Sequence, residues 1–330
     1  MNNADIIILG AGVAGLMAAR VLNEQGISTI LVDKGRSVGG RMATRRIGDG
    51  LADHGAQFFT ARTKQFQAQV EDWMRAGVVR IWGYGWSDSS LKRTAPDGHP
   101  RYVAVNGMNA LTQHMAATLP HIHVNCEIGT ISYANDLWTL TALDARVYVG
   151  RALIMTAPVP QSLHLLRAVS LTEKDRAALE RIQYAPCLTG MFVIEGDIDL
   201  PEPGAIQDNS KPIYWIGDNR AKGISQTLIV TAQADGLHSR QRYDLSDEDN
   251  LAWLQTTVEA HLTPGSRVVE GQLKKWRYAA PITTHPFDTM LAEELPLAFA
   301  GDAFGGRGRV EGAYLSGLAA GRALIEHLQA

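Results

Sequence analysis

Residues 6–15 read IIILGAGVAG, an apolar run that enters a G-x-G-x-x-G turn, and a second apolar run ends in the acid Asp33. Gly10 permits the tight turn, Gly12 lets the backbone approach a pyrophosphate, and Gly15 lets the following helix pack closely. Asp33 lies where the ribose of a bound dinucleotide needs a hydrogen-bond acceptor. The pattern therefore predicts a dinucleotide site. Because a carboxylate repels a 2′-phosphate, FAD and NAD remain open and NADP is disfavoured.

The composition excludes several classes of protein. The chain has 330 residues and a formal net charge of −3, with no basic run that would favour nucleic acid or a membrane surface. It has no apolar stretch of the roughly 18 residues needed to span a bilayer. Cys126 and Cys187 are far apart, which favours a reduced compartment, and no metal-ligand spacing is present. We expect a cytoplasmic protein with small-molecule partners, and no metal, nucleic acid, membrane or protein partner is indicated.

Hydrophobic periodicity predicts a dinucleotide fold that opens at one end of the chain and closes at the other. Its first unit is strand 5–10, helix 13–25 and strand 28–33, and its last is strand 297–300 followed by helix 311–328. Aromatic-rich alternation at 78–105 and strands within 187–235 and 268–280 predict a separate sheet-rich region. The remaining expected elements are a strand at 51–59, helices at 63–76, 109–119, 172–182 and about 246–261, an antiparallel meander of strands 122–124, 128–133 and 138–143, and a buried parallel strand at 152–156.

A second half of the cofactor site follows the strand at 297–300. A carboxylate at Asp302, after Gly301, can accept a hydrogen bond from a ribityl hydroxyl. The N-terminus of the helix near Gly312 can hold the partial negative charge of a reduced isoalloxazine. A nicotinamide site needs neither feature, so these residues favour FAD. The alternative is that Asp302 only caps a turn.

Motifs at both ends of the chain resemble those of flavin-containing amine oxidases. They are Gly10-x-Gly12-x-x-Gly15, Asp33-Lys34-x-Arg36-x-x-Gly39-Gly40-Arg41, Asp53-x-Gly55-Ala56-Gln57-Phe58 and Gly301-Asp302. Within that superfamily the chain most resembles the renalases of the shorter bacterial kind, through residues 53–60 and Lys275-Trp276-Arg277.

The resemblance implies an α/β fold with an α+β cap: a Rossmann-type FAD-binding domain and a sheet-rich substrate domain, as in p-hydroxybenzoate hydroxylase and the amine oxidases. The expected FAD-binding domain is discontinuous and takes residues 1–60, 106–158 and 286–330. The substrate domain takes residues 61–105 and 159–285.

The resemblance also implies the contacts of a non-covalent FAD. The ADP half and its surroundings are expected to involve Gly10, Gly12, Val13, Ala14, Gly15, Asp33, Lys34, Arg36 and Gly40, with Ile128 beside the adenine. The flavin half is expected to involve Gln57, Phe58, Gly301, Asp302 and Gly312, and Arg41 is expected to reach the phosphate or the flavin end. Ile128 as a plain core residue, Phe58 as an ordinary strand residue, and Arg36 and Arg41 as solvated loop charges stay open as alternatives.

Renalases oxidise the 2- and 6-dihydro isomers of NAD(P)H to NAD(P)⁺ by hydride transfer to flavin N5, and O₂ then yields H₂O₂. The resemblance implies this repair activity here. A planar ring that becomes aromatic needs stacking and hydride transfer, with no obligatory acid or base. Candidate pocket walls are Trp276, Tyr214, Trp215 and His285, and candidates to pair with a substrate pyrophosphate are Arg240, Arg242 and Arg277. Ordinary packing and solvated charge are the alternatives.

Three other functions fit the same motifs. A flavin-dependent amine oxidase would need an acidic or aromatic cage in the cap. A non-redox flavin-dependent isomerase would take up no O₂. A non-catalytic FAD-binding protein would not need a large cap, since a cap serves to enclose a small molecule.

Overall fold

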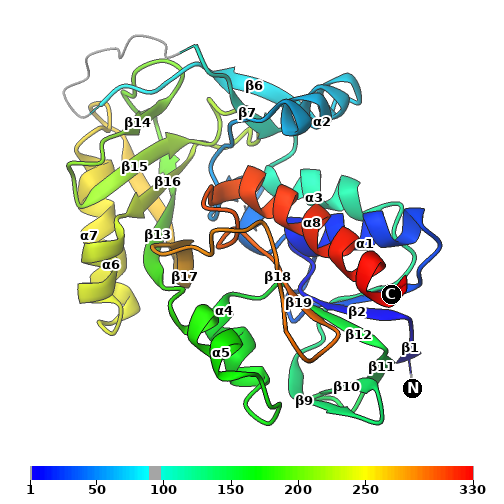
Figure 1. The fold of residues 1–330 in the computed structure, drawn as a ribbon. Coiled ribbons are helices and arrows are strands. Elements are labelled where there is room, and N and C mark those ends of the chain that lie inside the picture. The colour runs from blue at the N-terminus through cyan, green and yellow to red at the C-terminus, as the bar shows by residue number, and fades with distance from the viewer. Residues whose placement is uncertain (1, 89–97, 330) are drawn as a thin grey trace. The chain divides into compact units, whose positions relative to one another are not determined.

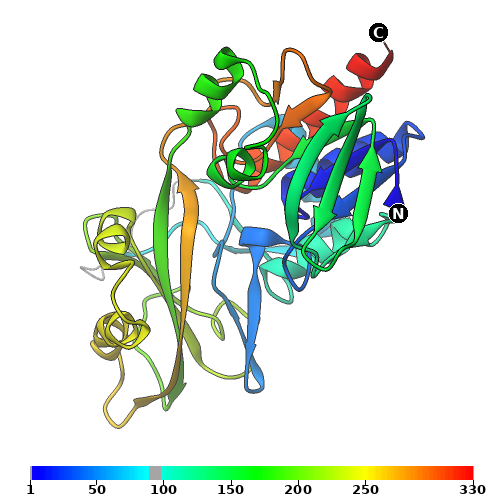
Figure 2. The ribbon, with the colours of Figure 1, turned by 90° about the horizontal axis from the view of Figure 1, so that it is seen from below.

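The computed structural model describes residues 2–88 and 98–329, and the chain divides into two compact units. Unit 1 comprises Met1–Gly40, Thr112–Gln183 and Ala280–Ala330, and unit 2 comprises Arg41–Leu111 and Tyr184–Ala279. Figures 1 and 2 show their elements. A Rossmann-type sheet in unit 1 and a separate sheet-rich region in unit 2 are both present, as the sequence predicts.

Unit 1 is built on a six-stranded sheet with the strand order β18-β19-β12-β2-β3-β8. Its strands are β2 (Ile6–Leu9), β3 (Thr29–Val32), β8 (Ile122–His123), β12 (Ala152–Met155), β19 (Leu297–Phe299) and the antiparallel β18 (Met290–Leu291). The other elements of this unit are α1 (Val13–Glu24), β1 (Asn2–Asn3), β9 (Ile128–Ala134), β10 (Leu137–Ala142), β11 (Val147–Gly150), α4 (Val159–Leu165), α5 (Glu173–Glu180) and α8 (Arg309–Gln329).

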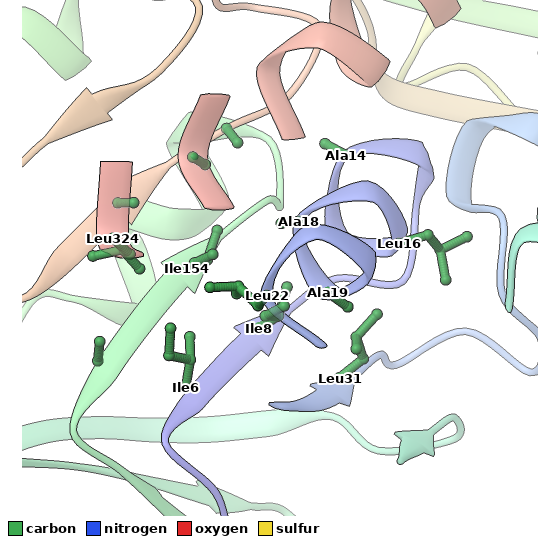
Figure 3. Close-up of a cluster of buried hydrophobic side chains, with 14 of the residues drawn as sticks. Ile6, Ile8, Ala14, Leu16, Ala18, Ala19, Leu22, Leu31, Ile154 and Leu324 are labelled. Atoms are coloured by element: carbon green, nitrogen blue, oxygen red, sulfur yellow. The ribbon is translucent and has the colours of Figure 1, made fainter. Parts of the chain in front are cut away.

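The central strands of this sheet are covered on both faces. Helices α1 and α8 pack together over one face, and the β9–β11 strands lie on the other (Figures 1 and 2). Strands buried on both faces read as continuous apolar runs, which explains the sequences of β2 and β12. Ile6, Ile8 and Ile154 meet Leu16 and Leu22 of α1 in one core (Figure 3).

The predicted meander is wrong at its first strand. Ile122 pairs in parallel with Leu31, so β8 extends the six-stranded sheet. The antiparallel meander consists instead of β9, β10 and β11, and β1 adds to its edge. A two-residue strand carries too little pattern to specify its neighbour, so its pairing is decided by tertiary structure.

Unit 2 is built on a five-stranded sheet with the order β14-β15-β16-β13-β17. Its strands are β13 (Tyr184–Glu195), β14 (Ala205–Gln207), β15 (Ile213–Asp218), β16 (Ile229–Ala234) and β17 (Arg267–Pro281), the last of which runs into unit 1. The other elements are the hairpin β4 (Thr44–Ile47) with β5 (Gly50–Asp53), the hairpin β6 (Val79–Gly83) with β7 (Arg101–Ala104), and the helices α2 (Lys64–Arg75), α6 (Gly236–Arg242) and α7 (Asp247–Glu259). Helix α3 (Met108–Ala116) crosses the boundary between the units, and a 3-10 turn covers Gly40–Met42.

The two faces of this second sheet are covered differently. Helices α6 and α7 pack on one face, and the β4–β5 hairpin packs on the other (Figure 2). On the hairpin side, Ile47 and Ala52 form a small core with Met191 and Ile229. The hairpin thereby brings the end of β5, at Asp53, against the middle of the sheet.

A buried ion pair fixes that end of β5. The Lys222 ammonium lies 2.5 Å from the Asp53 carboxylate, and the two side chains are 1% and 0% exposed. The same carboxylate accepts hydrogen bonds from the Thr44 hydroxyl and from the backbone N–H of Met108. Burial lowers the pKa of Lys222, and the Asp53 charge opposes that shift. One carboxylate thus ties the hairpin, the start of α3 and the turn after β15 together.

The compact units differ from the predicted domains at several boundaries. Residues 41–60 and 106–111 belong to unit 2, and residues 159–183 and 280–285 belong to unit 1. The predicted division assigned cofactor and substrate roles, so it stays a prediction. Within the described ranges, no helix is long and apolar enough to cross a membrane.

Replacing Lys222 is expected to destabilise the protein strongly. Lys222→Met leaves the Asp53 carboxylate buried without its cation, which costs about 3–5 kcal/mol of the free energy of unfolding. Lys174→Met is the matched control, because it removes the same side chain from an exposed pair with Glu293 and should change that free energy little. Urea unfolding of both variants measures the difference. Equal effects would show that the buried pair does not anchor unit 2.

Candidate functional site

The three glycines of the first turn have the geometry that a dinucleotide site requires. Gly10 has φ +115°, and a Cβ there would lie 2.3 Å from the Thr156 hydroxyl oxygen. A Cβ on Gly15 would lie 1.9 Å from the Gly10 carbonyl oxygen, whereas a Cβ on Gly12 would meet no atom within 4 Å. Helix α1 begins after Gly12 without a side-chain cap. The turn is therefore tight at Gly10 and Gly15 and open at Gly12. The N–H groups of the first helical turn have no acceptor within the helix and can bind an anion.

Asp33 holds this turn against β3. Its two carboxylate oxygens accept hydrogen bonds from the N–H groups of Ala11, at 2.7 Å, and Gly35, at 2.6 Å. Each oxygen keeps acceptor capacity for a ribose hydroxyl. The N–H of Gly39 donates to the Ala11 carbonyl at 2.8 Å, so the segment that ends at Gly40 also lies on the turn.

The segment before Ile128 is attached to the Asp33 loop. The N–H groups of Asn125 and Cys126 donate to the carbonyls of Gly35 and Asp33 at 2.8 and 2.9 Å. Ile128 is 5% exposed. This arrangement brings the predicted adenine-side residue into the same region as the predicted ribose acceptor. Of the other predicted ADP-side residues, Val13 and Ala14 are buried in the first turn of α1, whereas Lys34, Arg36 and Gly40 are exposed.

The C-terminal loop of unit 1 gathers three of the predicted residues. Gly301 has φ +145°, and its N–H donates to the Ser316 hydroxyl at 2.8 Å. Asp302 is buried, and Gly312 lies in the first turn of α8. The N–H of His285 donates to the Ala303 carbonyl at 2.7 Å. His285, predicted as a wall of the substrate domain, therefore lies within unit 1 beside this loop.

In unit 2 the predicted residues Phe58 and Trp215 belong to one aromatic cluster. Their ring centroids are 5.4 Å apart, and the Trp86 ring lies 5.1 Å from Phe58 and 5.2 Å from Trp215. Trp82 completes the cluster, 4.6 Å from Trp86. Trp215 is 1% exposed, so most of its indole is packed against these neighbours. Phe58 therefore packs against two indole rings of this cluster.

Two amide side chains hold the backbone next to Phe58. Gln57 Nε2 donates to the carbonyls of Asp53, at 2.7 Å, and Gly55, at 3.2 Å. Gln233 Nε2 also donates to the Gly55 carbonyl, at 2.8 Å, and its Oε1 accepts from the Tyr214 hydroxyl at 3.0 Å. Gln57 and Tyr214 are thus connected through the Gly55 carbonyl and Gln233. The sequence analysis did not select Gln233.

Trp276 lies in unit 2 against a histidine that the sequence analysis did not select. The Trp276 indole N–H donates to the His54 carbonyl at 2.7 Å, and the two rings stack at 5.4 Å and 19°. Burial, with a smaller contribution from the positive charges of Arg45 and Lys274, lowers the pKa of His54 to about 3. The sequence feature that could have identified His54 is its position inside the Asp53–Phe58 motif.

The arginines of this unit make contacts within the protein. Arg41 donates to the carbonyls of Tyr278 and Ala279, which argues against a fully solvated charge. Arg242 and Arg277 lie over the rings of Trp253 and Tyr243, while Arg240 donates to the Tyr184 carbonyl. Their predicted roles toward phosphates stay predictions.

Comparison with known proteins gives a family. Residues 8–75 match the NAD(P)-binding Rossmann-like domain, and residues 88–325, well over half of the chain, match the flavin containing amine oxidoreductases. This chain belongs to the flavin-containing amine oxidoreductase family.

Two solved structures show how far the likeness of fold extends. Cyclohexylamine oxidase from Brevibacterium oxydans IH-35A is 13% identical, with a TM-score of 0.75 over 99% of this chain and 100% of that one. Putrescine oxidase bound to putrescine is 14% identical, with a TM-score of 0.71 over 98% and 99% of the two chains. At these identities the likeness establishes the shared fold.

The residues of this amine oxidoreductase fit FAD, the cofactor of the family. The open space over Gly12 and the uncapped start of α1 suit a pyrophosphate, and Asp33 suits a ribose. When bound, the flavin supplies a hydride acceptor at N5. No group of three or more potential metal ligands is found in the two described ranges.

Removing the Asp33 carboxylate is expected to weaken FAD retention by about 10- to 100-fold, because charge-assisted hydrogen bonds are worth roughly 1.5–3 kcal/mol. Asp33→Ala loses the bonds to Ala11 and Gly35 as well as the ribose acceptor. Asp33→Asn keeps one acceptor oxygen, so its FAD retention should lie between that of the wild type and that of Asp33→Ala. FAD remaining after dialysis measures the effect. Unchanged occupancy in Asp33→Ala would exclude the ribose role.

The low pKa of His54 predicts a loss of stability in acid. In the unfolded chain the imidazole takes up a proton below its ordinary pKa near 6.5, whereas in the folded protein it stays neutral until about pH 3. Stability therefore falls as the pH drops through this window, by about 3 kcal/mol between pH 7 and pH 4. Guanidinium unfolding at both pH values should show this loss in the wild type and a smaller one in His54→Gln. Parallel losses would contradict the assignment.

Proposed function

We propose that this amine oxidoreductase is an FAD-dependent oxidase of dihydronicotinamide dinucleotides. It would convert the 2- and 6-dihydro isomers of NAD(P)H to NAD(P)⁺. One donor molecule, one O₂ and one proton would give one NAD(P)⁺ and one H₂O₂. The proposal places the activity in the repair of damaged nicotinamide, in the cytoplasm.

The charges around His54 and Trp276 carry this proposal. The two charges that act on the His54 imidazole belong to Arg45 and Lys274, and both are positive. The Lys274 ammonium also lies 4.8 Å from the centre of the Trp276 ring. A positive field attracts the pyrophosphate of a dinucleotide and opposes the binding of a cationic amine. Aromatic surface beside positive charge is therefore better matched to a dinucleotide than to an alkylamine.

The neutral side chains of the same unit support the proposed chemistry. Phe58 and Trp276 are partly exposed and offer aromatic surface, and Trp215 packs against Phe58. Gln57 and Gln233 hold the backbone by hydrogen bonds. These groups can orient a planar ring and exclude water without moving a proton. A dihydropyridine needs only that, since loss of a hydride makes its ring aromatic.

We assign the cofactor roles on the same basis. The turn from Gly10 to Gly15 and Asp33 would hold the ADP half, with Ile128 beside the adenine. Asp302 would accept a hydrogen bond from the ribityl chain. The FAD would be non-covalent, because both cysteines are buried and Cys187 has its pKa raised to about 11 by burial, which disfavours the reactive thiolate.

Anaerobic stopped-flow mixing with each donor tests the function. The 2- or 6-dihydro isomers should bleach the visible flavin absorbance rapidly, whereas the ordinary 4-dihydro form is the matched control and should react slowly. Admission of O₂ should then release one H₂O₂ per donor oxidised. Bleaching by a primary amine or polyamine alone would assign an amine oxidase. Substrate turnover without O₂ uptake or flavin bleaching would assign a non-redox isomerase.

A further inference from the structure

The His54 side chain is a buried polar group whose ring nitrogen Nδ1 has no hydrogen-bond partner within the described parts of the chain. The residue is 6% exposed. Buried polar atoms are nearly always paired, since leaving one unpaired costs free energy. His54 also lies inside the Asp53–Phe58 motif, which resembles that of the flavin-containing amine oxidases. Its buried, unpaired nitrogen is therefore a candidate contact for a bound molecule.

The imidazole cannot readily turn to find a partner inside the protein. The backbone N–H of His54 donates to the Ala43 carbonyl at 3.1 Å, and its carbonyl accepts from the Trp276 indole. The ring itself stacks on that indole. Next along the chain, a Cβ at Gly55 would lie 2.0 Å from the Arg41 carbonyl oxygen, so the backbone there passes close to that segment. These contacts hold His54 in place.

The neighbouring residue holds the segment more firmly still. The Asp53 N–H donates to Asn219 Oδ1, and the Asp53 carbonyl accepts from the Thr231 hydroxyl at 3.0 Å and from Gln57. Its carboxylate is bound by Lys222. The backbone on which His54 sits is thus fixed before any ligand binds, which is the property expected of a preorganised binding group.

The charge state limits what this ring can recognise. Burial, Arg45 of β4 and Lys274 of β17 all oppose protonation of His54. A neutral imidazole offers one N–H donor and one acceptor nitrogen. It can pair with a C=O or an N–H group but cannot act as an acid near neutral pH.

We propose that His54 is a ligand-binding residue whose imidazole hydrogen-bonds to the amide-like edge of a bound planar ring. Two molecules present that chemistry: the isoalloxazine, whose pyrimidine ring carries C=O and N–H groups, and a nicotinamide, whose carboxamide carries the same groups. The second source rests on the proposed function. The first requires only the FAD that the family binds.

The test compares His54→Phe with His54→Gln. Phenylalanine keeps a ring that stacks on Trp276 but has no nitrogen, whereas glutamine keeps an amide that can donate and accept. We expect His54→Phe to weaken the binding of one ligand by at least about 10-fold, and His54→Gln to restore part of it. The dissociation constant of FAD is measured by flavin fluorescence on dilution of the holoprotein. The dissociation constant of the donor comes from the concentration dependence of anaerobic flavin reduction.

The two arms identify the ligand. A weaker FAD complex assigns the contact to the flavin, and a weaker donor complex with unchanged FAD binding assigns it to the substrate. The donor arm applies where a dihydronicotinamide reduces the wild-type flavin. If only an amine reduces it, the proposed function fails and the FAD arm alone decides the His54 inference. If no donor reduces the wild-type flavin, the FAD arm decides alone.

Two further readouts separate ligand binding from a merely structural role. The flavin-stripped full chain of His54→Phe should melt no lower than wild type, because the variant removes an unpartnered buried nitrogen. The affinity ratio between variant and wild type should stay constant from pH 5 to pH 8. His261→Phe is the control, since His261 is another partly buried histidine of unit 2 with a burial-lowered pKa, and it should leave both affinities unchanged. Both dissociation constants within about twofold of wild type in His54→Phe would overturn the inference.

Discussion

The Asp53–Lys222 ion pair is the interaction on which the functional part of unit 2 depends. Both charges are removed from water, which costs free energy that their attraction alone rarely offsets, so the remaining lone pairs must be satisfied by hydrogen bonds. Thr44 and Met108 supply them. Each partner comes from a different part of the unit. The hydrogen bonds and ion pair of one buried carboxylate therefore hold together the β4–β5 hairpin, the start of α3 and the turn after β15. His54 follows Asp53 in the chain and Gln57 donates to the Asp53 carbonyl, so the ion pair also helps to position these two residues.

Unit 1 uses an acid in a comparable place with a different outcome. Asp33 also follows a strand, but its hydrogen-bond donors are the backbone N–H groups of Ala11 and Gly35, and no lysine neutralises it in the described structure of this loop. Its carboxylate is half-buried. It therefore keeps part of its acceptor capacity for a ligand, whereas the Asp53 carboxylate is buried and bound by Lys222, Thr44 and Met108. An aspartate can therefore remain available to a ligand in one unit and support the fold in the other, because its hydrogen-bond donors differ.

This difference also explains how much could be predicted from the sequence. The glycine turn, the apolar strands and Asp33 are local signals, and their placement was predicted. The partners of Asp53 and Gly55 were not predicted, because they are distant in the sequence. Lys222 lies 169 residues from Asp53, and Gln233 lies 178 residues from Gly55. A lysine in a loop looks solvated until the fold buries it. The prediction for the short strand β8 was wrong for a related reason, since its pairing with Leu31 depends on the whole sheet.

The neutral state of His54 links this architecture to the choice of substrate. Arg45 and Lys274 depress the pKa of the imidazole, and the same charges would depress the pKa of an amine bound beside it. Binding of a protonated amine would then cost free energy, or require loss of a proton, and would weaken as the pH falls. A dihydronicotinamide dinucleotide carries no such amine, and the same positive field would attract its pyrophosphate. The positive charges that keep His54 neutral therefore also favour a donor that needs no proton transfer.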